Sequence, residues 1–440
     1  MTPEPSPSAS LAGAQEIPPQ LPMLEALVEL EGRGAAGSEA PLAGWTALLI
    51  QHQLGSQVRM AQSLLQLGIA PGRMYWLDIP YTANGTVHDA LLALRVPEEN
   101  FAPSYYNLEL KYAAYQHERV QAMALRLADT LRPSDRLLVL DDGAYFLEAL
   151  TCLKDPPHDV RIVEQTTRGL IKIRGDAALE QRCQRCVMVN VAESAPKKTI
   201  EGGQIGTVVC DQLVARLGGA LRGTGPRRCL ILGFGSIGAN VAAALVRDLG
   251  IPAARIYVFD RDERARAAAV GAGHPVWSRM ATEPTRFDVV IGCSGTTSFT
   301  VGDRVFLEDG AVLASASSGS AELSREAFIE LADIHPGEDV YVVDRATLAT
   351  RSVHDEIQLH LVDRDVRFLN GGFPVNFDGR VNCVPPHLIQ ATHALQVGAA
   401  LEAARADRQG ILPVSEKLCT WVEGAFREMV ASPTTAPGPA

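Results

Sequence analysis

The feature that most restricts the fold of this chain is a glycine-rich turn placed between a strand pattern and a helical pattern. The segment 228–232 reads RCLIL, and Gly233, Gly235 and Gly238 follow it in the order GxGxxG. An Ala/Val/Leu-rich helical pattern and the strand pattern 255–260 come next. A GxGxxG turn alone is a weak signal, but in this context it is typical of a Rossmann domain that binds a dinucleotide.

The glycines permit a tight turn and let the backbone approach a pyrophosphate that lies on the helix N-terminus. We therefore predict cofactor contacts from the turn residues Gly233, Gly235, Ser236, Ile237 and Gly238. Asp260 lies 22 residues after Gly238, where its carboxylate can accept hydrogen bonds from ribose hydroxyls and repel a 2′-phosphate. The sequence thus favours NAD over NADP, although Arg261 weakens the preference. The simpler alternative is a Rossmann turn that binds no nucleotide.

Two further strand patterns, 287–292 and 311–315, extend this second half of the chain. Ser294 and Gly295 follow the first of them and are small and polar, as expected beside a nicotinamide ribose. An ordinary turn between a strand and a helix explains them almost as well. We keep them as predicted cofactor residues.

The N-terminal half also alternates strand and helix patterns, with apolar strand segments at 46–53, 74–79, 136–141 and 160–164. Such alternation predicts an α/β fold with a parallel sheet. Ligands of these sheets bind outside the carboxyl ends of the strands. Asp142 and Gln165 stand at such ends.

Charge and composition narrow the possible partners. The chain has 440 residues, which suggests two or three domains, and its 51 acidic and 40 basic residues give a net charge of −11. No basic field is available for nucleic acid. The apolar runs are too short to cross a bilayer and the first twenty residues lack a secretory pattern, so we predict a cytoplasmic protein without membrane contact.

The number and spacing of the cysteines indicate neither a disulfide scaffold nor a metal site. Eight cysteines in a chain of this length are too few for a disulfide scaffold. Cys183 and Cys186 form a close pair, but no second pair and no nearby His pair accompanies them. We therefore predict no metal site.

Five motifs in order resemble those of the S-adenosylhomocysteine hydrolase family. They are LDDG at 140–143, EQTTRG at 164–169, NVAESAPKKTIE at 190–201, the GFGSIG turn, and LNGG at 369–372. The resemblance extends from about residue 45 to 400 and marks a divergent relative. It implies a Rossmann-type NAD-binding domain (203–370) inserted in a second α/β parallel-sheet substrate domain (21–202), to which C-terminal helices (371–430) return. Pro- and Ser-rich tails at 1–20 and 431–440 are predicted to be disordered.

In that family a tightly held NAD⁺ oxidises the 3′-hydroxyl of a nucleoside, the 5′ substituent is eliminated from the acidified ketone, water adds, and NADH restores the alcohol. The resemblance implies that Lys197 works at the 3′-hydroxyl, that Glu201 replaces a family aspartate, and that Asp142 works at C4′ and C5′. His52 falls at a substrate-site histidine. A solvated surface ion pair is the simpler explanation for Lys197 and Glu201, and a packed or capping role for His52.

The resemblance also implies a nucleoside-like substrate and a homo-oligomer, either a dimer or a tetramer. It places Gln165, Thr166, Thr167 and Phe377 at the substrate and Asn370 at the cofactor. Several family positions are changed here: Gln165 replaces a catalytic glutamate, Gly202 an asparagine, and Ser318 a histidine. The loop after Asn370 differs, and the family's C-terminal NAD clamp has no counterpart.

These changes predict loss of ordinary S-adenosylhomocysteine hydrolysis, because each mismatched buried polar contact costs about 1–3 kcal/mol. Our first hypothesis is an adenosylhomocysteinase-like, NAD-dependent enzyme that acts on a nucleoside or related metabolite by 3′-oxidation with elimination or hydration at adjacent carbons. A catalytically silent homologue that binds NAD or a nucleoside and regulates a partner is the second. A plain dehydrogenase that releases its ketone is the third.

Overall fold

The computed structural model describes residues 15–33, 39–150, 159–217, 227–280, 285–320, 322–334, 341–342, 345–361 and 364–431. The chain divides into two compact units. Unit 1 comprises residues 1–104, 117–201 and 380–440, and unit 2 comprises 105–116 and 202–379. Most of the two predicted tails lies outside the described residues, but the backbone carbonyls of Glu16 and Pro18 accept hydrogen bonds from Asn382 and Arg59.

Unit 1 contains a six-stranded sheet in which every pair of neighbours is parallel. The order is β13-β5-β4-β3-β1-β2, with bounds β1 Trp45–Gln51, β2 Met74–Asp78, β3 Arg136–Asp141, β4 Asp159–Glu164, β5 Val187–Asn190 and β13 Gly410–Pro413. All seven residues of β1 are buried, as expected of a parallel strand that is covered on both faces. The strand order reverses direction between β1 and β3, so the crevice that commonly binds ligands opens at their carboxyl ends.

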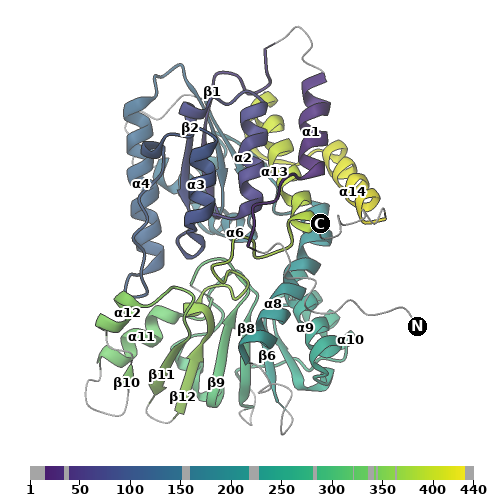
Figure 1. Ribbon diagram of the computed structural model, residues 1–440. Helices are drawn as coiled ribbons and strands as arrows, with labels where there is room; N and C mark the ends of the chain where they lie inside the picture. Colours follow the sequence, from purple (N-terminus) through teal and green to yellow (C-terminus); the bar gives the residue numbers. More distant parts are fainter. Residues whose placement is uncertain are drawn as a thin grey trace, which may run out of the picture. The chain divides into compact units, whose positions relative to one another are not determined.

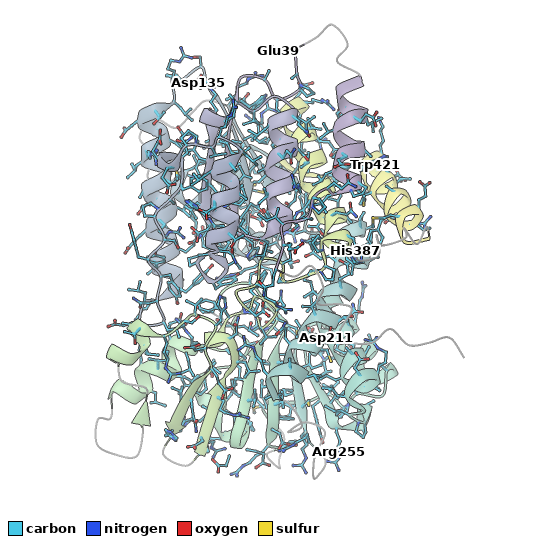
Figure 2. The ribbon with its side chains drawn as sticks, in the orientation of Figure 1. Glu39, Asp135, Asp211, Arg255, His387 and Trp421 are labelled. Atoms are coloured by element: carbon cyan, nitrogen blue, oxygen red, sulfur yellow. The ribbon has the colours of Figure 1, made fainter. Side chains whose placement is uncertain are left out.

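Helices surround this sheet in Figure 1. They are α1 Pro22–Arg33, α2 Gly55–Gln66, α3 Gly85–Ala93, α4 Tyr112–Thr130, α5 Tyr145–Ala149, α6 Thr167–Gly175, α7 Ala177–Cys183, α13 Pro386–Arg405 and α14 Glu416–Ala431. The α13 helix packs against α1, α2 and α14 and against strands β3, β4 and β5. Figure 2 labels His387 near its beginning and Trp421 on α14. Because α13 is buried on most of its surface, small and apolar residues dominate it.

Unit 2 contains a seven-stranded sheet in the order β10-β11-β12-β9-β8-β6-β7. The bounds are β6 Cys229–Leu232, β7 Ile256–Phe259, β8 Phe287–Gly292, β9 Leu307–Ser315, β10 Tyr341–Val342, β11 Ile357–Leu361 and β12 Arg364–Phe368. The strands from β12 to β7 are parallel, and β11 pairs antiparallel with both β12 and β10. Its helices are α8 Gly202–Leu217, α9 Ser236–Leu249, α10 Glu263–Gly271, α11 Arg325–Ile334 and α12 Arg345–Thr350.

The predicted fold class is confirmed: the chain forms two α/β units with mainly parallel sheets. Unit 2 differs from the predicted insertion 203–370 because it includes 105–116 and extends to Gly379. Arg325 holds that early segment, since its guanidinium donates to the Tyr106 hydroxyl and to the carbonyls of Leu110 and Gly371. In the described part of the chain, no helix is long and apolar enough to span a membrane.

Candidate functional site

His52 and Asp142 meet at the point where the strand order of unit 1 reverses. His52 follows β1 and Asp142 follows β3, and their Nε2 and Oδ2 atoms lie 3.2 Å apart. Gln165 follows β4, and its Nε2 donates to the same Oδ2 atom at 2.5 Å. All three side chains are buried, with 5–8% of each residue exposed. The structure thus brings together three predicted site residues from the ends of three neighbouring strands. Asp135, which precedes β3, marks the opposite edge of this sheet in Figure 2.

The hydroxyl of Thr82 indicates where the His52 ring carries its protons. This hydroxyl donates to the carbonyl of Ile79 at 2.8 Å, so it accepts from His52 Nδ1 at 3.3 Å. Nε2 faces a carboxylate oxygen and is a donor only when it also carries a proton. The ring therefore lies between the Thr82 hydroxyl and the Asp142 carboxylate.

The surroundings of Asp142 favour its ionised form. Burial alone would raise the pKa of this carboxyl, but the charge and hydrogen bond of His52 oppose burial. The amide of Gln165 and the charge of Lys197 act in the same direction, and together they hold the pKa of Asp142 below its ordinary value. Gln165 therefore stabilises the neighbouring carboxylate although it cannot exchange a proton itself.

Lys197 and Glu201 form an ion pair on a single π-helical turn, Lys197–Glu201. The Nζ and Oε2 atoms are 2.6 Å apart, and the two side chains are only 17% and 18% exposed. The hydroxyl of Thr392, from α13, donates to the same Oε2 at 2.5 Å. This pair is therefore largely buried, which does not fit the simpler explanation of a solvated surface pair.

Two residues near this pair, Thr392 and His393, are not predicted from the sequence. His393 is buried on α13, and its Nε2 lies 2.9 Å from the Ser56 hydroxyl. Burial, and then the charge of Lys197, lowers the pKa of His393 to about 3, so this ring stays neutral. The only signal in the sequence is a set of polar residues within an Ala- and Leu-rich helical stretch.

Asp142 and Gln165 are directly preceded by Asp141 and Glu164, the last residues of β3 and β4. Both of these acidic side chains are fully buried. Asp141 accepts from the backbone N–H groups of Tyr145 and Phe146 at the start of α5. Glu164 accepts from the loops that follow both strands. Burial raises the pKa of Asp141 to about 6. Burial, together with the charge of Asp141, raises the pKa of Glu164 to about 8.

We expect these carboxyls to give the protein a distinctive pH dependence of stability. The folded pKa of Glu164 lies above its ordinary value of 4.5, so between these values the folded state holds a proton that the unfolded chain releases. The free energy of unfolding should therefore fall as pH rises towards 8, by up to about 1.4 kcal/mol per pH unit. The buried His393 acts oppositely, but only below its ordinary pKa of 6.5.

Urea unfolding between about pH 6.5 and 8 isolates the contribution of Glu164. The slope should be negative in the wild-type protein and should flatten in Glu164→Gln, which has no titrating group at this position. A slope that is positive, or that is the same in both proteins, would contradict the assignment.

In unit 2, the predicted cofactor turn joins β6 to α9. Gly233 has φ +94°, and a Cβ on Gly238 would lie 1.9 Å from the carbonyl oxygen of Gly233, so both positions require glycine. A Cβ on Gly235 would meet no described atom within 4 Å. The α9 helix begins at Ser236, directly after Gly235, which has no side chain that could cap the helix. Open space beside Gly235 at the N-terminus of α9 fits the pyrophosphate of a dinucleotide.

The other predicted cofactor residues of unit 2 adjoin this turn. A Cβ on Gly233 would lie 2.7 Å from the Cα of Ser294, so the loops after β6 and β8 touch. Asp260 accepts from the backbone N–H of Phe234 at 2.6 Å. The buried Glu322 accepts from the N–H groups of Ser294 and Gly295 and thereby fixes their loop.

The side chains of Asn370 and Thr166 are used mainly by the protein itself. The amide of Asn370 donates to the carbonyls of Pro374 and Phe377, and its oxygen lies 3.2 Å from atoms of Arg216 and His354. Phe377 belongs to the same loop of unit 2. The hydroxyl of Thr166 donates to Glu164 and caps α6, whereas Thr167 is exposed.

The structure gives a physical explanation for Gly202, which replaces an asparagine of the resembled family, and for the cysteine pair. A Cβ on Gly202 would lie 2.0 Å from the Ser236 hydroxyl, so this side chain takes the room of a larger residue at 202. The thiol of Cys183 is buried and donates to the sulfur of Met188 at 3.5 Å, which is a packing contact. Among the described residues, no three His, Cys, Asp or Glu side chains are grouped as a metal site requires.

Comparisons with known proteins identify relatives without a described function. No family model matches the chain. Two uncharacterised proteins of Mycobacterium tuberculosis, from two strains, are 27% identical over 372 residues, which is 84% of this chain and 66% of theirs. The chain thus spans slightly less than two thirds of the length of these relatives.

Solved structures give only distant likenesses. A dipicolinate synthase component from Bacillus halodurans has a TM-score of 0.37 and 12% identity, covering 65% of this chain and 87% of its own. The corresponding dipicolinate synthase structure from Bacillus subtilis has a TM-score of 0.33 and 12% identity, covering 66% and 86%. Rhodotorula graminis D-mandelate dehydrogenase has 0.33 and 11%, covering 66% and 78%. None of these three proteins is an S-adenosylhomocysteine hydrolase, and likenesses this distant carry no information about activity.

Proposed function

We propose that this protein is an NAD-dependent enzyme that oxidises a ring hydroxyl of a nucleoside or related sugar-containing metabolite and moves protons at the adjacent carbons. The observation that carries the proposal is the presence of two buried acid/base pairs in unit 1. These pairs are Lys197 with Glu201 and His52 with Asp142. They are close enough that the charge of Lys197 acts on Asp142.

The turn of unit 2 is where a cofactor fits. The space beside Gly235 at the N-terminus of α9 suits a pyrophosphate, and Asp260 suits the ribose hydroxyls of NAD. NAD⁺ bound there would supply the hydride acceptor. The carboxylate of Asp260 would repel the 2′-phosphate of NADP.

The two pairs of unit 1 carry out the proton transfers. Lys197, when its Nζ is deprotonated, accepts the proton of the substrate hydroxyl, and Glu201 holds Nζ in place through the 2.6 Å contact. His52 carries a proton on Nε2, and the Asp142 carboxylate stabilises it there. Oxidation would acidify the C–H bond of the adjacent carbon, whose proton passes to the Asp142 carboxylate, and the His52 proton is available to a leaving group on the next carbon.

Gln165 favours a second candidate function. In the S-adenosylhomocysteine hydrolase family, which the sequence resembles, this position holds a glutamate that exchanges protons. The Gln165 amide instead donates a hydrogen bond to Asp142. A silent homologue that binds NAD and a nucleoside without turnover, and regulates a partner protein, would retain such a hydrogen bond. The expected cytoplasmic location and homo-oligomeric state are compatible with both candidates.

A titration with substrates separates the candidates. Purified protein with NAD⁺ is mixed with adenosine, S-adenosylhomocysteine and a panel of modified nucleosides, and the near-ultraviolet absorbance of NADH is followed. We expect a rise that stays below the protein concentration, because the hydride returns to the product in each cycle. A rise far above the protein concentration would indicate a dehydrogenase that releases its ketone. Demonstrated NAD binding with no rise for any compound would support the silent homologue.

A further inference from the structure

The buried carboxyl of Glu164 joins the two loops that carry Asp142 and Gln165. Its Oε1 accepts from the backbone N–H of Gly143 at 3.3 Å and from the N–H and hydroxyl of Thr166, both at 2.7 Å. Its Oε2 accepts from the N–H of Ala144 at 2.8 Å. One side chain therefore holds the residues that directly follow Asp142 and Gln165.

The backbone around Glu164 is built to admit this carboxyl. Ala144 has φ +55°, a left-handed conformation that is uncommon for a residue with a side chain, and Gly143 has φ +114°. With these angles, the two successive N–H groups point to the same carboxyl. At Gly169 a Cβ would lie 2.4–2.6 Å from the atoms of the Glu164 carboxyl, so only glycine leaves room for it.

Within the described residues of β3 and β4, no sheet hydrogen bond joins the loops that follow the two strands. The last bond between the two strands runs from the N–H of Gln165 to the carbonyl of Asp141 at 3.3 Å. Beyond that bond the two chains separate into their loops. Among the described residues, Asp141 accepts hydrogen bonds from Tyr145 and Phe146 of α5.

We propose that Glu164 is a positioning residue that keeps the Gln165 amide on the Asp142 carboxylate by binding the backbone of both loops. Asp142 and Gln165 then stay 2.5 Å apart, and Asp142 remains ionised beside His52. This inference rests on the proposed function only for the role of Asp142 in proton transfer. The hydrogen-bond link itself is independent of substrate.

The test is the titration of the Asp142 carboxyl in Glu164→Gln. The glutamine is isosteric, but one of its ends is an NH₂ group, which would face the N–H groups of one loop. In protein labelled with ¹³C at the aspartate carboxyls, the Asp142 signal is assigned by its loss in Asp142→Asn. We expect the midpoint of this signal to rise by about one pH unit in Glu164→Gln, because the Gln165 amide is no longer fixed on the carboxylate. Because burial raises the pKa of Glu164 to about 8, its carboxyl is already protonated where Asp142 titrates, so Glu164→Gln changes the hydrogen bonds there and not the charge.

A matched control lies in unit 2. Glu322 is also buried and also fixes a loop after a strand, through Ser294 and Gly295. Glu322→Gln should leave the Asp142 midpoint unchanged. An Asp142 midpoint that is the same in wild type and in folded Glu164→Gln would overturn the proposal.

A second pair of variants decides the question if Glu164→Gln does not fold. Thr166→Ala removes one of the four hydrogen bonds, and Thr166→Ser keeps it. The Asp142 midpoint should rise in Thr166→Ala and return to the wild-type value in Thr166→Ser, and equal midpoints in all three proteins would overturn the proposal. The titration uses no substrate, so a failed search for NADH formation would count against the proposed function and leave this inference standing.

Discussion

Lys197→Ala should reduce the initial rate of NADH formation by about 10²- to 10⁴-fold, the range typical of a lost general base. Lys197 is the basic group of the Lys197–Glu201 pair. The described contacts of this pair include no other lysine. Alanine leaves Glu201 bonded to Thr392 but removes the atom that would accept the hydroxyl proton. The measurement is the near-ultraviolet absorbance of NADH with the compound that responds best in the wild-type protein.

The neighbouring lysine supplies the control. Lys198 is exposed and lies next in sequence, so Lys198→Ala changes the net charge equally without touching the buried pair. We expect its rate to stay near the wild-type value. NAD binding, measured separately by calorimetry, should be the same in both variants. Full turnover in Lys197→Ala would remove Lys197 from the mechanism.

Gly235→Ala is expected to weaken NAD binding on the order of 100-fold while leaving the protein as stable as before. The φ of Gly235 is −75°, which alanine adopts readily, and its Cβ would meet no described atom. The added methyl group would instead occupy the space proposed for the pyrophosphate. Losing the hydrogen bonds of a displaced pyrophosphate removes about 3 kcal/mol of binding free energy, which corresponds to that factor.

Substitutions of two other glycines serve as controls for this experiment. Gly271→Ala, at the end of α10, adds a methyl group that also meets no described atom, and it should change neither stability nor NAD binding. Gly238→Ala should destabilise unit 2, because its Cβ would collide with the Gly233 carbonyl. If Gly235→Ala bound NAD as tightly as the wild type, the turn would be a structural glycine turn without a nucleotide.

Local features of the fold and site could be predicted because neighbouring residues determine them. The GxGxxG turn has the strand and helix that its pattern predicts, and Asp142 and Gln165 do stand at strand ends. The contact between Lys197 and Glu201 follows from their spacing of four residues, although the turn is π-helical. These contacts need no information about the rest of the chain.

Contacts between distant segments could not be predicted in this way. The hydroxyl of Thr392 reaches Glu201 across 191 residues, and no local pattern marks either partner. Residues 105–116 fall within the predicted substrate domain 21–202, but they belong to unit 2. Asn370 matches a cofactor motif, yet its amide is engaged in holding its own loop. Long-range packing decided each of these outcomes.

The return of α13 and β13 to unit 1 has a consequence for synthesis of the protein. The β13 strand completes the sheet beside β5, and α13 covers that sheet and supplies Thr392. At a typical elongation rate, about ten to forty seconds separate the emergence of Glu201 from that of Thr392. During this interval the first two hundred residues lack their covering helix and expose apolar surface on the ribosome, whereas residues 202–379 of unit 2 emerge as one continuous stretch. Molecular chaperones should therefore bind the nascent residues of unit 1 until α13 and β13 have been translated.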